Sequence, residues 1–226
     1  MARREKQRRS EARLRWAYRE FLAAHRLPQA LFCEGLRIYA PSGVYHPHPR
    51  SSSRFMLARL PEIRDARVLD MGTGTGVIGL YLAAREFGND VTLTDVDPAA
   101  CAAAEINAMV NDRWARVVRA DVWEGLPARE RYDVVIWNLP LLDKPIEEKA
   151  DLMACDPGGR LARRFLDGLP GRLARGGRAY VLTSSHSAPL EKRLGRLGLS
   201  MRVLGAHERA SRMEVLMVEI AKRRVA

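Results

Sequence analysis

Residues 68–79 read VLDMGTGTGVIG, and this short stretch decides the fold of the 226-residue chain. Its apolar beginning predicts a buried strand, and the glycines after it predict a tight turn that opens a helix. Glycine lets the backbone approach a ligand closely, and the first turn of a helix presents N–H groups without partners. The stretch therefore predicts an α/β fold that holds a ligand at the end of its first strand.

An acidic residue at the end of this strand narrows the choice of ligand. The carboxylate of Asp70 would repel a pyrophosphate, whereas it would attract the ammonium group of an amino acid. The spacing G-x-G-x-G also departs from the dinucleotide fingerprint G-x-G-x-x-G. We therefore expect S-adenosylmethionine, an amino acid that carries a sulfonium, rather than NAD. The residues expected to hold this part of the cofactor are Asp70, Gly72, Thr73, Gly74 and Gly76.

Two more acidic residues end the next two predicted strands. Asp95, with Val96 beside it, follows the strand 91–94 and can accept both hydrogen bonds of a ribose diol. Asp121, with Val122 beside it, follows the strand 117–119 and can accept a hydrogen bond from the adenine amino group. Asp97 precedes Pro98 and is expected to cap a helix. The order of these strand ends predicts one cofactor site along one edge of a sheet.

The chain from residue 67 onward alternates strands and helices. Strands are expected at 67–70, 91–94, 117–119, 134–137 and 179–183, helices at 77–85, 98–109, 159–173 and 190–197, and a final hairpin at 201–206 and 214–220. Repeated strand–helix units predict a mostly parallel sheet covered on both faces. We expect a doubly wound, Rossmann-like α/β fold with seven strands, in which the hairpin adds an antiparallel strand.

The first 42 residues follow a different pattern. Apolar side chains recur at helical spacing over 11–26, which predicts an amphipathic helix, and residues 27–53 are rich in Pro, Ser and Gly, which predicts a loop or short extended segments. We expect a basic N-terminal helical extension or cap over 1–42 and a cofactor-binding domain over 43–226.

The charge of the chain is +11, and its first 20 residues carry eight basic and three acidic side chains. This basic arm is either a solvated helix start or a surface that faces RNA or the ribosome. Apolar runs are too short for a membrane span of about 20 residues, and no secretory signal follows the basic start. The three cysteines are far apart, which fits neither a disulfide framework nor a zinc site. A cytoplasmic protein is expected.

These segments resemble the class I S-adenosylmethionine-dependent methyltransferases. Within that family the likeness is to the branch that methylates amide and exocyclic amino nitrogens, which includes release-factor glutamine methyltransferases and rRNA guanine N2-methyltransferases. Residues 44–51 resemble the V-Y-x-P-x-x-D-[ST] segment that covers the cofactor there, which implies cofactor contacts for Tyr45 and Ser51. Residues 133–141, DVVIWNLPL, resemble the strand that ends in N-P-P-Y, and residues 156–178 resemble its D-G-G-x-x-G … P-G-G-R continuation.

The resemblance implies that Asn138, Leu139 and Pro140 form the acceptor site, with Asn138 also close to the cofactor. An amide or aryl amine is a poor nucleophile, because its lone pair is delocalised. An Asn side-chain oxygen and a neighbouring backbone carbonyl can accept both of its N–H bonds and hold the nitrogen in line with the S–CH₃ bond. Leu141 stands where that branch has an aromatic residue, so Trp137 or Tyr45 is the candidate stacking face.

The acceptor itself stays open among three hypotheses. The likeness and the basic arm favour a macromolecule of the translation apparatus, either an rRNA base or a protein glutamine. The altered tetrapeptide and the short N-terminus favour a small metabolite. A cofactor-binding scaffold without catalysis is the third. His46 and His48 lack a third ligand in the sequence and are expected to be loop residues rather than a metal site, and His186 is a weaker general-base candidate.

Overall fold

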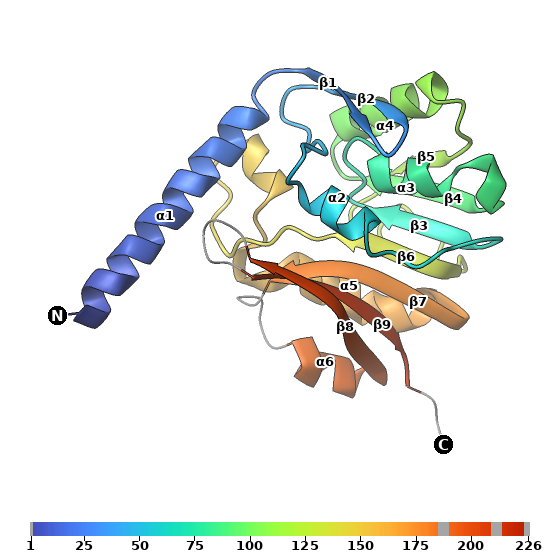
Figure 1. Ribbon diagram of the computed structural model, residues 1–226. Coiled ribbons are helices and arrows are strands. Elements are labelled where there is room, and N and C mark those ends of the chain that lie inside the picture. Colours follow the sequence, from blue (N-terminus) through green and yellow to red (C-terminus); the bar gives the residue numbers. More distant parts are fainter. Residues whose placement is uncertain (1, 185–189, 209–213, 224–226) are drawn as a thin grey trace.

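The computed structural model describes residues 2–184, 190–208 and 214–223. Its main strands are β3 (Arg67–Met71), β4 (Asp90–Asp95), β5 (Arg116–Arg119), β6 (Tyr132–Asn138), β7 (Leu173–Ser184), β8 (Leu199–Glu208) and β9 (Glu214–Lys222). They form one seven-stranded sheet in the order β5-β4-β3-β6-β7-β9-β8 (Figure 1). The pairs from β5 to β7 are parallel, whereas β9 is antiparallel to both its neighbours. This confirms the predicted doubly wound sheet with an antiparallel strand from the final hairpin.

Helices cover both faces of this sheet. They are α2 (Ser52–Leu57), α3 (Val77–Leu82), α4 (Pro98–Val110), α5 (Arg160–Arg172) and α6 (Leu190–Arg196), with short 3-10 turns at Arg85–Phe87, Lys149–Met153 and Pro157–Gly159. Alternate residues of the central strands enter two separate cores: Val68 and Ile136 pack on one face, and Leu69 and Val135 on the other. Because strands buried on both faces need apolar side chains at nearly every position, β6 contains an unbroken apolar run from Val134 to Trp137, and four of the five residues of β3 are buried.

The N-terminal prediction needs correction. Helix α1 spans Ala2–Ala24, so it begins nine residues before the predicted start at residue 11. The added turns lack apolar periodicity, but they consist largely of Ala, Arg, Lys, Gln and Glu, which have high helix propensity. After α1 the chain forms a hairpin of β1 (Gln29–Cys33) and β2 (Leu36–Ala40), where only short extended segments were expected.

Two asparagines of α4 fasten this hairpin to the body. The side chain of Asn107 accepts from Tyr39 N at 2.8 Å and donates to Tyr39 O at 2.8 Å. Asn111 makes the same pair of bonds with Arg37, at 2.8 and 2.7 Å. Leu36 of β2 is buried in the core that also holds β3, so the hairpin packs as part of the main body. The boundary predicted at residue 42 stays a prediction.

The structure also bears on membrane insertion. Within the ranges that it describes, α1 is the longest helix and its sequence is strongly charged, and none of the helices there has the length and apolar character to cross a bilayer.

Candidate functional site

A cleft of about 780 Å³ opens at the carboxyl ends of the parallel strands. Its walls come from the ends of β3 to β6, the segment 43–53, the C-terminal half of α1 and the segment 149–154. Of the predicted site residues, those that line it are Tyr45, Asp70, Gly72, Thr73, Gly74, Asp95, Val96, Asp121, Val122, Asn138, Leu139 and Pro140. The fold therefore brings together residues that lie up to 95 positions apart in the sequence. Ser51 and Gly76 lie behind this lining.

The turn after β3 requires its glycines. Gly72, Gly74 and Gly76 have φ of +60°, +57° and +82°, in the left-handed region that side chains disfavour. A Cβ on Gly72 would lie 2.7 Å from Trp137 Nε1, and one on Gly74 would lie 3.4 Å from the Tyr45 carbonyl. Gly76 begins α3 and packs beneath the turn. The turn thus brings bare backbone to the floor of the cleft.

Asp70 is the last residue but one of β3 and has a buried carboxylate, with 2% of the residue exposed. Its Oδ2 accepts from Thr73 Oγ1 at 2.6 Å and from Gly79 N at 2.9 Å. Burial raises its pKa to about 6, against the lowering effect of these two bonds. Gly79 is a residue whose role the sequence analysis missed: a Cβ there would lie 3.0 Å from the Asp70 carboxylate. The glycine lets α3 present its N–H to that carboxylate.

Asp95 ends β4 beside Asp70. It accepts from Gly74 N at 2.9 Å and from Asp97 N at 3.0 Å, and burial raises its pKa. The charge of Asp95 also raises the pKa of Asp70. Buried Asp70 and partly exposed Asp95 thus bring two carboxylates together at a place that a cation would stabilise. The expected cap is confirmed, since Asp97 accepts from Ala99 N at the start of α4.

Asp121 lies at the end of β5 with a partner that the sequence did not indicate. Arg164 of α5 donates to Asp121 Oδ1 at 2.9 Å and to its backbone oxygen at 3.2 Å. Val122 has φ of +57°, which turns the backbone into the cleft after the strand. Asp121 is therefore less available to a ligand than Asp95, because its carboxylate is shared with a guanidinium.

The side chain of Asn138 extends from the end of β6 into the cleft. Its Nδ2 donates to Ser53 Oγ at 3.2 Å, so the amide is oriented with its oxygen away from Ser53. The segment 43–53 is fixed in turn by Tyr45, whose hydroxyl lies 2.7 Å from Ser52 Oγ. Ser51 caps α2 by accepting from Arg54 N. Ser52 and Ser53, rather than Ser51, face the cleft.

Helix α1 supplies a wall of the cleft; the sequence predicts an N-terminal cap on the acceptor side but singles out none of the α1 residues that line the cleft. The Tyr18 hydroxyl donates to buried Asp151, and Lys144 Nζ lies 3.8 Å above the Tyr18 ring. One face of the helix, including Trp16 and Glu20, lines the cleft, and Trp16 is 60% exposed. Trp137, by contrast, is buried with its ring edge-on to Phe165. The exposed aromatic surface at the mouth is therefore on α1.

Three histidines lie together beside this wall, and one of them, His48, lines the cleft. The ring of buried His25 is 4.1 Å from that of His46 and 6.4 Å from that of His48, between ring centres. Burial lowers the pKa of His25 to about 4, so its ring is neutral at physiological pH. In the part of the chain that the structure describes, His, Cys, Asp and Glu form no group of three or more arranged to hold a metal ion. His186 lies outside the described residues.

Comparison with known proteins identifies the family to which this chain belongs. Residues 35–209 match the family described as the methyltransferase small domain. The release factor glutamine methyltransferase of Bordetella pertussis is 35% identical over 125 residues, which are 51% of this chain and 46% of that protein. The chain thus covers less than half the length of that relative.

Two solved structures share the fold. The T. thermophilus 16S rRNA methyltransferase RsmC, in complex with AdoMet and guanosine, has a TM-score of 0.65 at 22% identity, over 87% of this chain and 50% of that one. The E. cuniculi Mtq2–Trm112 complex, responsible for methylation of the eRF1 translation termination factor, gives a TM-score of 0.58 at 26% identity, over 80% of this chain and 99% of that one.

Proposed function

Because this chain belongs to the methyltransferase small domain family, whose cofactor is S-adenosylmethionine, we propose that it N-methylates an amide or amino nitrogen of a translation-apparatus macromolecule. The acceptor sites of the named relatives are a release-factor glutamine and a 16S rRNA base. Asn138 is the observation that carries the proposal, because it offers an amide oxygen at the point where β6 meets the cleft.

The cofactor assignments follow the charges of the cleft. Asp70 would receive the ammonium group of the methionine part, over the bare backbone of Gly72 and Gly74. Asp95 would accept from the ribose hydroxyls, and Asp121 would face the adenine amino group. The pairing of these two carboxylates supports a cationic ligand, since a positive charge near them would offset the effect by which Asp95 raises the pKa of Asp70.

The chemistry asked of the protein is mainly positioning. The sulfonium supplies a methyl group on a good leaving group, so the chain needs to align the acceptor nitrogen with it. Asn138 Oδ1 would accept one N–H of the acceptor, and the backbone carbonyl of Leu139 would accept the other. Ser53 holds the amide of Asn138 so that its oxygen, and not its nitrogen, is presented.

A small planar metabolite is the second candidate acceptor. It is favoured by the apolar side chains that surround the acceptor half of the cleft, namely Leu139, Leu141, Leu142, Leu152 and Met153. Such a lining suits an uncharged ring as well as a splayed base. The scaffold hypothesis loses support, because the family is one of methyltransferases.

The test is transfer of labelled methyl from S-adenosylmethionine into a cell extract that is then separated into RNA, protein and small molecules. Asn138→Ala should slow transfer by about 100-fold while the dissociation constant of the cofactor changes less than about twofold, because the residue acts on the acceptor. Ser53→Ala should slow it by about tenfold, since the amide loses its orientation. Label found only in small molecules would refute the macromolecular acceptor. Loss of cofactor binding in a folded Asn138→Ala protein would refute the role of Asn138.

A further inference from the structure

We propose that Arg164 positions the Asp121 carboxylate for adenine and so makes the cofactor site selective for a 6-amino purine over a 6-oxo purine. The inference rests on the proposed function, in which Asp121 faces the adenine amino group of S-adenosylmethionine. It starts from the place of Asp121, which follows the edge strand β5 and lines the cleft with its side chain 44% exposed. The last torsion of an Asp side chain is soft, so the direction of an open carboxylate depends on its partners.

Arg164 holds this carboxylate from helix α5. Its Nη1 donates to Asp121 Oδ1 at 2.9 Å, and its Nη2 donates to the Asp121 backbone oxygen at 3.2 Å and to Glu124 Oε1 at 3.1 Å. Contacts of one planar guanidinium with both the side chain and the backbone of Asp121 fix the direction of the carboxylate. Within the described residues Asp121 Oδ2 accepts no hydrogen bond, so one oxygen is held and the other is left for a donor.

Helix α5 is a firm support for this contact. Phe165, next to Arg164, is buried, and its ring stacks on that of Trp123 at 5.5 Å between ring centres. Trp123 Nε1 donates to the backbone oxygen of Phe165 at 3.0 Å. A Cβ on Gly168 would lie 2.3 Å from the same indole, so glycine there lets the ring lie against the helix. The segment after β5 is therefore packed on the helix that presents Arg164.

The turn that carries Asp121 has a conformation that depends on such support. Val122 has φ of +57°, where β-branched residues rarely lie. Backbone bonds between Asp121 and Glu124, at 3.0 and 3.1 Å, close the turn around it. Strained residues persist only where their surroundings hold them, and they cluster at ligand clamps. The contacts from α5 hold this turn, and both Asp121 and Val122 line the cleft.

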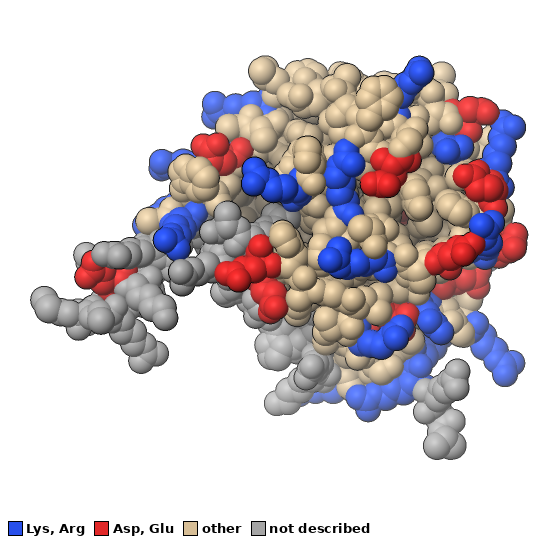
Figure 2. Space-filling view, in the orientation of Figure 1, with Lys and Arg blue, Asp and Glu red and all other residues tan. Residues whose placement is uncertain are grey.

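Ion pairs are frequent on this protein, so the pairing alone would carry no argument. Figure 2 shows Lys and Arg side chains beside Asp and Glu side chains at several places on the surface. In the described part of the chain, the cleft-lining carboxylates with ion pairs are Asp97 and Asp121. Asp97 serves as the cap of α4, and Lys149 meets it through one ammonium contact. Arg164 differs because it makes three directed hydrogen bonds around a carboxylate that has an open oxygen.

Selectivity follows from what the open oxygen can accept. Adenine has an amino group at C6, which donates a hydrogen bond, whereas hypoxanthine has a carbonyl oxygen there, which would face Asp121 Oδ2. A site with a polar group directed at a donor rejects the analogue that lacks the donor, because the polar group is then left unpaired. A freely rotating carboxylate would turn away from the carbonyl toward water and lose this discrimination. Arg164 thus acts on the base through Asp121.

The test compares two ligands that differ in the group at C6. Isothermal titration calorimetry of the full chain measures S-adenosylhomocysteine and S-inosylhomocysteine, and the wild type should bind the first at least about 30-fold more tightly. R164Q should lower that ratio by about tenfold, mainly through weaker binding of the adenine form. R164K keeps a cation beside Asp121 but lacks the planar fork, so it should recover part of the ratio. No recovery in R164K would mean that Arg164 acts through packing alone and would overturn the proposal.

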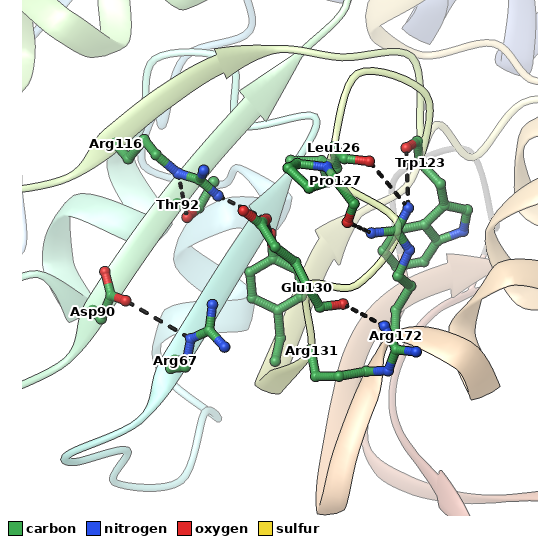
Figure 3. Close-up of polar contacts among 11 residues, drawn as sticks. Arg67, Asp90, Thr92, Arg116, Trp123, Leu126, Pro127, Glu130, Arg131 and Arg172 are labelled. Atoms are coloured by element: carbon green, nitrogen blue, oxygen red, sulfur yellow. Dashed lines mark hydrogen bonds and ion pairs between the residues drawn. The ribbon is translucent and has the colours of Figure 1, made fainter.

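Arg172 provides a matched control. It lies on the same helix and also donates to the segment after β5, at the carbonyls of Pro127, Leu126 and Trp123 (Figure 3). Its contacts hold backbone rather than a cleft-lining carboxylate. R172Q should therefore lower the thermal stability through lost hydrogen bonds and leave the ratio of the two affinities within about twofold of the wild type. An equal fall of the ratio in R172Q and R164Q, or an unchanged ratio in R164Q, would show that Arg164 supports only the fold.

D121N separates this proposal from the adenine assignment on which it rests. Arg164 would hold the amide oxygen of the variant and leave its NH₂ toward C6, so the preference should vanish or turn toward the 6-oxo ligand. Loss in D121N but not in R164Q would overturn the role of Arg164 and keep Asp121 at the adenine. An unchanged preference in both would overturn the adenine assignment and the proposal together.

Methyl transfer gives a second readout. R164Q should raise the KM for S-adenosylmethionine by about tenfold with little change in kcat, because the residue acts on cofactor binding. A fall in kcat at saturating cofactor, with KM unchanged, would contradict a role at the adenine. The binding experiments need no acceptor, so they stand whether or not Asn138 proves to direct N-methylation.

Discussion

The carboxylates at the two edges of the central sheet have different kinds of partner. At the carboxyl edge, Asp70 and Asp95 accept from N–H and hydroxyl groups, and within the described residues neither forms an ion pair. At the amino edge, arginines from the strand starts and nearby loops face carboxylates and carbonyls of the chain itself (Figure 3). At the first edge Asp97 and Asp121 have cationic partners but Asp70 and Asp95 do not, whereas the acidic side chains Asp90 and Glu130 of the second edge face arginines.

At the amino edge, the arginines form ion pairs and hydrogen bonds with carboxylates and carbonyls of the chain itself. Arg116 pairs with Glu130 at 2.8 Å, and Arg67 lies 3.9 Å from Asp90. Arg172 donates to the carbonyls of Pro127, Leu126 and Trp123, and its guanidinium lies 5.5 Å from the Trp123 ring (Figure 3). These contacts close the loop between β5 and β6. The comparison teaches that unmatched buried charge, and not charge density, marks the ligand site.

The largest expected effect is a loss of cofactor affinity on substitution of Asp70, at the carboxyl edge of the sheet. Asp70→Asn should weaken S-adenosylmethionine binding by about 10- to 100-fold, equivalent to about 1.5–3 kcal/mol for a lost charged hydrogen bond. Isothermal titration calorimetry measures it, with circular dichroism to show an intact fold. An unchanged dissociation constant would mean that this carboxylate serves only the turn.

Asp95→Ala should have a similar or smaller effect, about 1–3 kcal/mol, because it leaves the ribose hydroxyls unpaired. S-Adenosylhomocysteine and its 2′-deoxyribose analogue sharpen the test. The wild-type protein should prefer the ribose form, and the variant should lose most of that preference. Equal discrimination by both proteins would remove Asp95 from the ribose site.

Cofactor affinity should depend on pH through Asp70. Its folded pKa is about 6, above the usual 3.8, so the carboxyl is largely protonated below pH 6. A bound ammonium group favours the ionised form, so binding should strengthen as pH rises and level off above about pH 7. We expect about tenfold weaker binding at pH 5 than at pH 7. A flat profile in the wild type, or the same slope in Asp70→Asn, would contradict the assignment.

The smallest effect on the cofactor is expected at the matched edge. Glu130→Gln removes the charge that pairs with Arg116, which is itself partly exposed, so the free energy of unfolding should fall by only about 0.5–1 kcal/mol. The dissociation constant of S-adenosylmethionine should stay within about twofold. Thermal denaturation and calorimetry on one preparation give both numbers. A large loss of cofactor affinity would show that the two edges are coupled.

Local signals explain what the sequence could predict. The glycine turn and the acidic strand ends are short motifs, and the alternation of strands and helices follows apolar runs of a few residues. These signals therefore predict Asp70, Asp95 and Asn138 at one edge of the sheet, and all three line one cleft. Their binding roles stay predictions.

Contacts between distant segments explain what the sequence could not predict. The bond from Tyr18 to Asp151 joins residues 133 positions apart, and it turns a basic helix into a wall of the cleft. Arg164 reaches Asp121 from 43 positions away. Neither pairing leaves a pattern within one segment. Apolar periodicity predicts too short a helix at the N-terminus, because α1 extends beyond the residues that form its apolar face.

The asparagine contacts of α4 also limit how the hairpin can move. Four residues of a helix rise about 6 Å, and two residues of a strand span about 6.7 Å. Two asparagines four residues apart on the helix can therefore both reach the strand, whereas a third at the same spacing would no longer be aligned with it. Asn107 and Asn111 therefore hold β2 at two positions, each through a pair of hydrogen bonds to its backbone. A slip by one residue would turn the core side of β2 outward, and only a slip by two would find the same bonds. The hairpin is therefore held in one register against α4. This register fixes how many residues connect the hairpin to Tyr45 at the cleft.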